Sequence, residues 1–258
     1  MRRRARRLTP SAGQLRGPSL IMNTGLFITG TDTGVGKTLA ARLIVRSLAA
    51  AGIRTAVMKP VAAGCDTTPA GARNEDAVAL MAEASVEAPY ELVNPYCLAA
   101  PVSPHIAAAE AGVNIDLERL AGCCDQLSQR ADCVVVEGAG GWLVPISDRQ
   151  SMADLALRLK LPVVLVVGLR LGCLNHALLT SEAIRSRGAR FGGWVANHLD
   201  PAFERRQENL DTLSRLLGAP PLADIPHGAG ADRGWLLPAA ASQRLLAVAR
   251  ESRKMRDR

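Results

Sequence analysis

The 258-residue sequence has few aromatic residues, no long hydrophobic run and no paired-cysteine motif. Aromatic side chains make up 3% of it, against 48% for all hydrophobic residues, so we expect alanine, valine and leucine to fill the core. The longest apolar run, Leu161 to Gly168, is far shorter than the roughly 20 residues that a membrane-spanning helix needs. The sequence therefore predicts no transmembrane segment and no membrane partner.

The six cysteines contain no C-x-x-C pair. The adjacent Cys123 and Cys124 lie on a stretch with helical spacing, which is not a zinc-binding pattern. Several of the others fall in apolar segments. We therefore expect reduced, buried thiols in a cytoplasmic protein. The cysteines are Cys65, Cys97, Cys123, Cys124, Cys133 and Cys173.

The net charge of +7 is concentrated at the N-terminus. Six arginines and no acidic residue lie within residues 1–21, so the rest of the chain is almost neutral and gives no reason to expect a nucleic-acid partner. This segment has neither a helical period nor the apolar region of a signal peptide. We expect a disordered basic leader, residues 1–21, followed by one domain, residues 22–258. An organelle transit peptide is the alternative.

We expect a chain that starts at Met22 to keep its stability and activity, because residues 1–21 carry no apolar period with which to pack. Thermal melting followed by circular dichroism, together with turnover of the shortened chain, provides the test. A loss of folding or of turnover would mean that the leader is a structural element.

The glycine-rich segment from Gly30 to Thr38, GTDTGVGKT, carries the strongest functional signal. It follows the apolar run Leu26–Ile28 and precedes a stretch with helical spacing, and strand, glycine loop and helix in this order indicate a phosphate-binding loop. The loop N–H groups and the helix N-terminus attract phosphate, Lys37 reaches the β- and γ-phosphates, and the Thr38 hydroxyl suits Mg²⁺. The sequence therefore predicts that the protein binds a nucleoside triphosphate.

Short apolar runs alternate with helical patterns along the rest of the chain. Val163–Val167 is apolar at every position, which indicates burial on both faces and hence a parallel sheet between helices. We predict an α/β fold of the P-loop NTPase type, with a single-domain, mostly parallel β-sheet flanked by helices. The predicted strands are Leu26–Thr29, Thr55–Lys59, Cys133–Glu137, Val163–Gly168, Gly193–Asn197 and Leu222–Ile225. The predicted helices are Thr38–Ala51, Glu75–Ala84, Pro104–Ala111, Asp116–Arg130, Met152–Leu159, Leu174–Arg187, Ala202–Leu217 and Pro238–Arg253.

Polar residues end several predicted strands, at the edge where parallel sheets bind ligands. Glu137 ends one strand and is followed by Gly138-Ala139-Gly140. A carboxylate at this place beside a phosphate loop is typical of a Mg²⁺ ligand, usually Asp, and an acidic strand end in a glycine turn is the alternative. Asn197 ends another strand, where its amide would pair with a base edge or make a turn.

Three further segments are candidates for binding. Pro60 forces an extended backbone and directs Lys59 toward the ligand edge, although a solvated lysine is the alternative. Asp76 is a second candidate Mg²⁺ ligand, but Asp near a helix start is more often a cap. The segment Gly172–Asn175 opens a helix whose free N–H groups would suit a carboxylate.

Taken together, these segments resemble the dethiobiotin synthetase family. The resemblance runs in order from about Asn23 to His227. The phosphate loop alone is shared with many ATPases, whereas its combination with Lys59-Pro60 and the glycine turn after Glu137 is specific. The matching motifs beyond the loop are Lys59–Val61, Asn94–Tyr96, Pro101–His105, Val136–Gly141, Leu171–Ala177 and Trp194–Asn197.

The resemblance implies a cyclo-ligase of biotin biosynthesis that converts 7,8-diaminononanoate, CO₂ and ATP into dethiobiotin, ADP and phosphate, with Mg²⁺ as cofactor. It implies small-molecule substrates, a cytoplasmic location and a homodimer with sites at the interface. The implied catalytic residues are Lys59 and Lys37, and the implied Mg²⁺ ligands are Thr38, Asp76 and Glu137. The implied substrate residues are Lys59, Gly172, Cys173 and Asn175. The implied ATP-binding residues are Gly34, Val35, Gly36, Lys37, Thr38, Leu39, Asp76, Glu137, Gly138, Ala139, Gly140, Asn197, His198, Pro226, His227 and Gly228.

One position departs from the family pattern, which usually has Ser or Thr where this chain has Ala63 in KPVAAG. One hydroxyl contact to substrate or phosphate is therefore absent. The alternative function is a MinD- or ParA-like ATPase switch, whose loop carries an extra lysine at the place of Asp32. A cobyrinate-amidating enzyme is a third option, but this chain has no glutaminase domain to supply ammonia.

Overall fold

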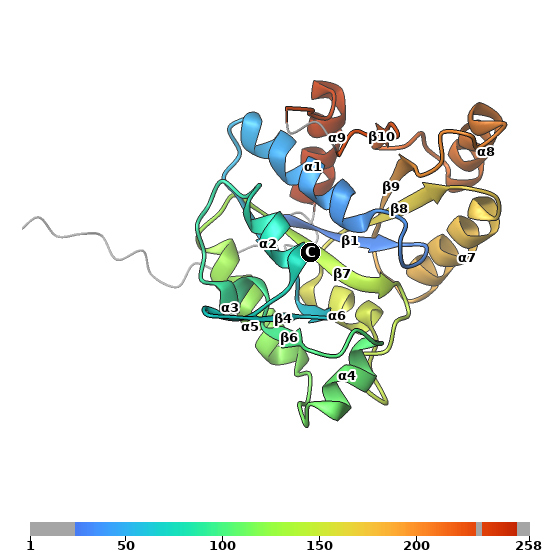
Figure 1. Ribbon diagram of the computed structural model, residues 1–258. Coiled ribbons are helices and arrows are strands. Elements are labelled where there is room, and N and C mark those ends of the chain that lie inside the picture. The colour runs from blue at the N-terminus through green and yellow to red at the C-terminus, as the bar shows by residue number, and fades with distance from the viewer. Residues whose placement is uncertain (1–23, 231–233, 252–258) are drawn as a thin grey trace, which may run out of the picture.

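A computed structural model describes residues 24–230 and 234–251 of the chain (Figure 1). Six strands form one sheet in the order β10-β9-β8-β1-β7-β2, and every neighbouring pair is parallel. All six strands predicted from the sequence are confirmed, as is the parallel sheet. The predicted leader, residues 1–21, lies outside the described residues. The strands are β1 (Gly25–Gly30), β2 (Thr55–Met58), β7 (Cys133–Gly141), β8 (Val163–Leu169), β9 (Phe191–His198) and β10 (Ala223–Ile225).

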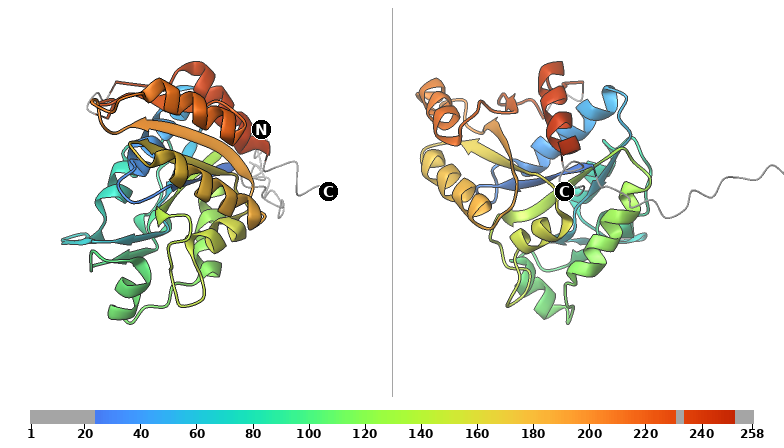
Figure 2. Two further views of the ribbon diagram at one scale, coloured as in Figure 1. Left: turned by 90° about the vertical axis from the view of Figure 1, so that its right-hand side faces the viewer. Right: turned by 180° about the vertical axis from the view of Figure 1, so that it is seen from behind.

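Helices cover both faces of this sheet (Figures 1 and 2). On one face α1 (Lys37–Ala50) packs against α2 (Glu75–Met81) and α9 (Ala239–Glu251). On the other face α5 (Leu117–Ser128) packs against α6 (Met152–Leu159), while α7 (Cys173–Ser186) packs against α8 (Arg206–Leu217). None of the helices among the described residues is long and apolar enough to span a membrane.

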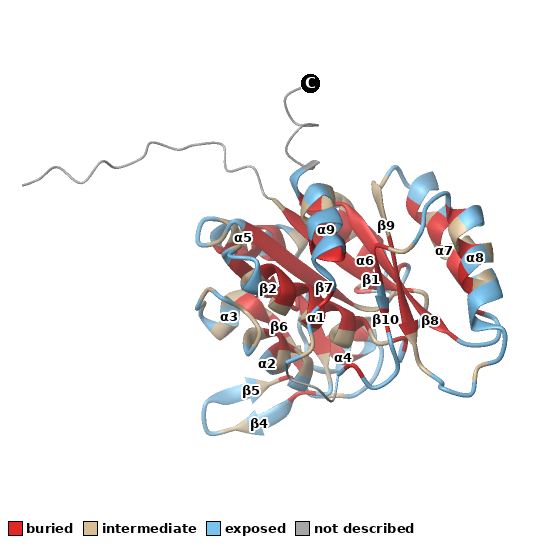
Figure 3. Cartoon of the chain, turned by 90° about the horizontal axis from the view of Figure 1, so that it is seen from above, coloured by how far each residue is buried: buried red, intermediate tan, exposed pale blue. Residues whose placement is uncertain are grey.

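The core lies between the helices and the two faces of the sheet, as the buried strands in Figure 3 show. Every residue of β1 and of β8 is buried, which confirms the interpretation of the continuous apolar run in Val163–Val167. Trp194 in β9 is among the largest fully buried side chains, whereas alanine, valine and leucine supply most of the rest. The low aromatic content is therefore compatible with a well-packed interior.

A long excursion between β2 and β7 carries elements that the sequence analysis missed. β3 (Val61–Ala63) pairs in parallel with β6 (Tyr96–Leu98), and β4 (Asp66–Thr68) forms a hairpin with β5 (Gly71–Arg73). The short helix α3 (Tyr90–Val93) was missed as well, whereas α4 (Pro104–Glu110) confirms the helix predicted over Pro104–Ala111. Strands of three residues give no clear alternation in the sequence, because their pairing is set by distant partners.

The excursion also overturns part of the cysteine prediction. Cys65 follows β3 and Cys97 lies in β6, and a disulfide joins them. The expectation of six reduced thiols is therefore wrong for this pair, since the parallel pairing of β3 and β6 places the two side chains within bonding reach. The remaining four cysteines are buried, as predicted: Cys123, Cys124, Cys133 and Cys173.

Two helix ends differ from the predicted ones, and a local side-chain hydrogen bond accounts for one of them. α2 starts at Glu75 as predicted, after Asn74, whose side chain accepts a hydrogen bond from the Ala77 N–H, but it ends at Met81 rather than Ala84. α8 starts at Arg206 rather than Ala202, because Asp200 accepts a hydrogen bond from the Ala202 N–H and turns the chain first. Such side-chain bonds compete with helix formation and leave no period in the sequence.

A half-buried acid, Glu83, links α1 to the segment that follows α2. The Glu83 carboxylate pairs with Arg42 at 2.8 Å and with Arg46 at 2.6 Å. The hydrogen bond from Arg46 lowers the pKa of Glu83, and the bond from Arg42 adds to this, although partial burial opposes both. Because the folded-state pKa lies below the unfolded one, this pair stabilises the fold above the ordinary Glu pKa of about 4.3 and loses its effect as the pH falls through the lowered value.

We therefore expect Glu83→Gln to lower the melting temperature at pH 7, with the deficit shrinking as the pH approaches 3. Glu118→Gln is the matched control, since Glu118 also pairs with an arginine, Arg158, but its side chain is 69% exposed. Calorimetric melts of both variants and the wild type across pH 3 to 7 give the measurement. Equal deficits for the two variants at pH 7 would mean that burial of the Glu83 pair adds nothing.

Candidate functional site

The site lies at the carboxyl edge of β1, β7 and β2, which are neighbours in the sheet. The phosphate loop follows β1, Glu137 lies within β7, and Lys59 directly follows β2. The order of the strands thus brings together three predicted site residues that are far apart in the sequence. This is the edge at which parallel sheets bind ligands.

The phosphate loop has the backbone conformation that its glycines permit. Gly34 and Gly36 have φ of 75° and 84°, values that other residues rarely adopt. A Cβ on Gly36 would also lie 2.1 Å from Nδ2 of Asn197, so no larger residue fits there. The amide of Asn197 donates to the Val35 carbonyl over 2.9 Å and holds the loop against β9. A role of Asn197 at a base edge stays a prediction.

Lys59 is buried between the two predicted acidic ligands. Its Nζ donates to Oδ2 of Asp76 over 2.8 Å and to Oε1 of Glu137 over 2.6 Å. The lysine side chain is 6% exposed, which rules out the solvated alternative. Asn74, not Asp76, caps α2, so the capping alternative for Asp76 is also wrong. The structure therefore groups Lys59, Asp76 and Glu137 in one cluster.

Burial and charge in this cluster together shift the pKa values of both lysines. Burial lowers the pKa of Lys37 to about 8, with the nearby Lys59 charge acting in the same direction against the pull of Glu137. Burial also opposes the charged form of Lys59, but Glu137 and Asp76 outweigh it and raise its pKa. Burial would raise the pKa of Asp76, yet Lys59 outweighs this and lowers it. Lys59 is therefore held as a cation at neutral pH.

The cluster fits a divalent cation. Oε2 of Glu137 is buried and has no hydrogen-bond partner among the described residues, while Oε1 accepts from the Thr38 hydroxyl over 2.8 Å. Carboxylate and hydroxyl oxygens are ligands that Mg²⁺ accepts. A buried carboxylate oxygen without a partner is costly unless a cation or water satisfies it. The three predicted Mg²⁺ ligands, Thr38, Asp76 and Glu137, thus converge on one place.

The predicted base-binding residues gather at the ends of β9 and β10. His198, Pro226 and His227 line a cavity of about 390 Å³. The sequence analysis missed three further lining residues, Arg206, Asp224 and Trp235, which stand in no recognisable motif. Gly228 follows His227 with φ of 81° and does not line this cavity.

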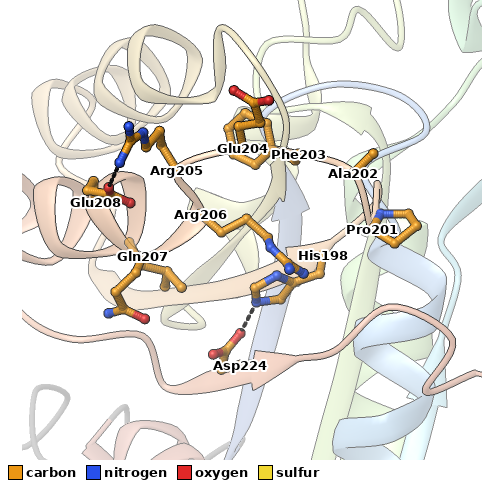
Figure 4. Close-up of a pocket in the computed structure, with 11 residues that line it drawn as sticks. His198, Pro201, Ala202, Phe203, Glu204, Arg205, Arg206, Gln207, Glu208 and Asp224 are labelled. Atoms are coloured by element: carbon orange, nitrogen blue, oxygen red, sulfur yellow. Dashed lines mark hydrogen bonds and ion pairs between the residues drawn. The ribbon is translucent and has the colours of Figure 1, made fainter.

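A second hollow adjoins this cavity beside the start of α8 (Figure 4). It shares His198, Arg206 and Asp224 with the first one. His198 Nε2 lies 2.6 Å from Oδ1 of Asp224, which fixes the imidazole at the wall between the two hollows. The ends of β9 and β10 therefore offer a site with polar and aromatic walls.

The predicted carboxylate site lies at the N-terminus of α7, which follows β8. Gly172 has φ of 94° and allows the sharp entry into the helix, Cys173 is buried, and Asn175 is exposed. Arg170 pairs with Asp32 of the phosphate loop at 2.9 Å, so this helix start lies beside the loop. Contact of these residues with a substrate stays a prediction.

The chain is similar in sequence to known proteins. Residues 24–233 match the family described as "AAA domain". The ATP-dependent dethiobiotin synthetase BioD of Aromatoleum aromaticum is 50% identical over 219 residues, which cover 85% of this chain and 96% of that protein. The BioD protein of Xanthomonas axonopodis pv. citri is 48% identical over 82% of this chain and 95% of its own length. The chain belongs to the dethiobiotin synthetase family. The predicted resemblance is confirmed, and so is the prediction of an enzyme.

Solved structures add information about the fold. MinD of Aquifex aeolicus superposes with a TM-score of 0.52 at 18% identity, over 89% of this chain and 97% of that one. MinD of Pyrococcus horikoshii, complexed with Mg-ADP, gives a TM-score of 0.50 at 16% identity. At this identity the likeness establishes the P-loop NTPase fold alone. It gives no support to the MinD-like switch over the dethiobiotin synthetase family.

Proposed function

We propose that the protein catalyses ATP-dependent closure of a ureido ring, in which 7,8-diaminononanoate and CO₂ give dethiobiotin while ATP gives ADP and phosphate. The observation that carries this proposal is the buried Lys59 on Asp76 and Glu137, beside the phosphate loop of a dethiobiotin synthetase-family chain. A phosphate loop needs one lysine for ATP. The second buried cation suits a second anion, and the carbamate formed from CO₂ and an amine is such an anion.

The reaction has three bond-forming steps, and these residues supply positive charge that favours them. An amine nitrogen of the diamine attacks CO₂ and loses a proton, which gives a carbamate. A carbamate oxygen then attacks the γ-phosphorus of ATP and ADP leaves, so that a mixed anhydride forms. The neighbouring amine attacks the carbonyl carbon, the ring closes, and phosphate leaves with the second proton removed.

Two anions approach each other in the phosphoryl-transfer step, so preorganised positive charge should supply much of the rate. Lys37 would hold the β- and γ-phosphates, and the raised pKa of Lys59 keeps it protonated to hold the carbamate. The loop N–H groups and the start of α1 add partial positive charge. In this assignment both lysines bind and orient, and neither has to transfer a proton.

Thr38, Asp76 and Glu137 would hold the Mg²⁺ ion. When bound, Mg²⁺ neutralises charge on the phosphates. The Oε2 atom of Glu137 supports this assignment, because it is buried and has no hydrogen-bond partner among the described residues. The carboxylates of Asp76 and Glu137 attract both Lys59 and a divalent cation. The two acids would therefore hold the lysine for the carbamate and the Mg²⁺ ion for the phosphates.

The outer parts of the site would bind the ends of the two larger substrates. The cavity lined by His198, Pro226 and His227 would take the adenine, and its size of about 390 Å³ suits one base with its sugar. The N-terminus of α7 would take the diaminononanoate carboxylate through the Leu174 and Asn175 N–H groups. A cytoplasmic location remains a prediction.

We also propose a homodimer, with α7 at or near the interface. Large apolar side chains are exposed around its start: Leu143 is 51% exposed, Leu171 94% and Leu179 58%. Leu143 and Leu179 line a hollow of about 440 Å³ that also contains Thr31–Thr33 of the phosphate loop. A second copy would cover these side chains and would complete the substrate site.

We expect Leu179→Glu to shift the protein from dimer to monomer and to raise the KM for diaminononanoate, because a charge would then be desolvated in the interface. Leu216→Glu is the matched control, since Leu216 on α8 is 43% exposed and lies on another helix. Sedimentation velocity measures the oligomeric state. A wild-type monomer at micromolar concentration would overturn the dimer.

A coupled assay of ADP release tests the reaction itself. We expect release that requires both diaminononanoate and bicarbonate, with dethiobiotin identified by mass spectrometry. ADP release that is equally fast without either substrate would favour an ATPase switch instead. Addition of EDTA should stop turnover, and excess Mg²⁺ should restore it.

A further inference from the structure

The hydroxyl of Tyr90, at the start of α3, joins two segments that carry site residues. The Asn74 N–H donates to this hydroxyl over 2.7 Å, and the hydroxyl donates to Oδ1 of Asn94 over 3.0 Å. Burial raises the pKa of Tyr90, so its proton is retained at neutral pH. Cys97 Sγ lies 3.6 Å away and is the hydroxyl's remaining polar neighbour in the described part of the chain.

The Asn94 side of this bridge fixes the backbone of Lys59. Asn94 is 3% exposed, and its Nδ2 donates to the Lys59 carbonyl over 2.6 Å. The Lys59 N–H donates to the Val93 carbonyl over 2.8 Å. The N–H and the carbonyl of Lys59 are therefore both bound to the end of α3. These two bonds fix the direction in which the Lys59 side chain leaves the backbone, and the bonds to Asp76 and Glu137 hold its amine.

The Asn74 side of the bridge fixes the first turn of α2. Asn74 is buried and caps this helix by accepting from the Ala77 N–H over 3.2 Å. Asp76 lies in the turn that this cap starts, and its carboxylate bonds the Lys59 amine over 2.8 Å. One hydroxyl is thus bonded to the cap that carries Asp76 and to the amide that holds Lys59.

We propose that Tyr90 is a positioning residue for the reaction, whose hydroxyl sets the spacing between Lys59 and Asp76. This inference rests on the function proposed above for those two residues. Tyr90 acts through Asn94 and Asn74. Loss of its hydroxyl would leave the Asn74 N–H and the Asn94 Oδ1 without their shared partner, and both segments could then shift.

The chain contains a matched control, because its second and last tyrosine has the same kind of contacts elsewhere. The Tyr96 hydroxyl accepts from the N–H of Asp116 over 2.9 Å, and Asp116 caps α5 as Asn74 caps α2. An arginine lies over each ring, Arg73 at 4.0 Å from Tyr90 and Arg119 at 4.8 Å from Tyr96. The Tyr96 hydroxyl, however, is bonded to the cap of α5 and not to a residue that holds Lys59 or Asp76.

The experiment compares Tyr90→Phe with Tyr96→Phe in the full-length protein. Turnover is expressed per ATP-binding site, counted by calorimetry. Unfolded molecules in the sample therefore do not lower the measured kcat. We expect Tyr90→Phe to lower kcat about tenfold, on the scale of one or two lost hydrogen bonds, with the KM for ATP changed less than twofold. It should also raise the Mg²⁺ concentration for half-maximal rate, whereas Tyr96→Phe should leave all three values within twofold of wild type.

Hydrogen–deuterium exchange gives a readout that does not depend on activity. Amides of α2 and of the segment around Lys59 should exchange faster in Tyr90→Phe and not in Tyr96→Phe. If the wild type needs no diaminononanoate for ADP release, the proposed function fails, while this exchange pattern still tests the bridge.

Equal kcat for the two variants, or equal exchange at these segments, would overturn the positioning role. If Tyr90→Phe does not fold, Asn94→Ser replaces it, because this variant removes the bond to the Lys59 carbonyl and leaves the bond between Tyr90 and Asn74. The same tenfold loss of kcat is then expected, and an unchanged kcat would overturn the inference.

Discussion

Lys37→Ala should lower turnover by about a thousandfold or more while the protein remains folded. The side chain is 7% exposed, and its amine donates to the Asp32 carbonyl within the loop over 2.8 Å, so its charge is held where the phosphates are expected. Loss of one preorganised charge of this kind costs a factor of about 100 to 1000 in rate, and the loss of affinity for the phosphates adds to it.

Folding should survive this change because burial already disfavours the charged form of Lys37, whose pKa is lowered to about 8. The coupled ADP assay and a thermal melt give the two measurements. Lys160→Gln is a suitable control, since Lys160 is exposed and precedes β8, at the amino edge of the sheet. Near-wild-type ADP release by Lys37→Ala would show that this loop does not bind the transferred phosphate.

Lys59→Gln should lower diaminononanoate-dependent turnover by about a hundredfold or more, while ATP still binds. The glutamine keeps much of the length of the side chain and removes its charge. A switch that only binds and hydrolyses ATP has no need of this second lysine, whereas a carbamate needs a cation that ATP does not occupy. The variant therefore separates the two candidate functions.

This change should also lower the melting temperature, because Glu137 is 1% exposed and would lose its charged partner. Calorimetric titration with ATP counts the folded molecules, and turnover is divided by that count. Lys160→Gln again serves as the control. Unchanged turnover per folded molecule would make Lys59 a bystander and would place the carbamate elsewhere.

The six strands of the sheet could be predicted from the sequence because burial on both faces leaves continuous apolar runs, as in Val163–Val167. The short strands of the excursion could not, since β3 and β6 have three residues each and are stabilised by each other across a disulfide. The start of α8 also escaped prediction, because a single side-chain bond to Asp200 decides it.

Some of the site residues could likewise be predicted from the sequence, and others could not. Lys37, Thr38 and Glu137 stand in motifs, so their types and spacing indicated their chemistry. The direct pairing of Lys59 with Asp76 and Glu137 depends on the strand order and on the excursion, which periodicity does not reveal. Tyr90 gave no signal at all, because a tyrosine at the start of a four-residue helix has no distinctive pattern. Trp235, Arg206 and Asp224 were missed for the same reason.

The place of β1 within the sheet has a consequence for how the chain folds during synthesis. Phe27 in β1 lies opposite Val136 of β7 and Val163 of β8, more than a hundred residues later in the chain. The phosphate loop therefore gains its neighbouring strands only after most of the chain has left the ribosome. Such distant contacts slow folding and leave apolar strands exposed to aggregation in the meantime. Nascent chains should consequently depend on chaperones until β8 is complete.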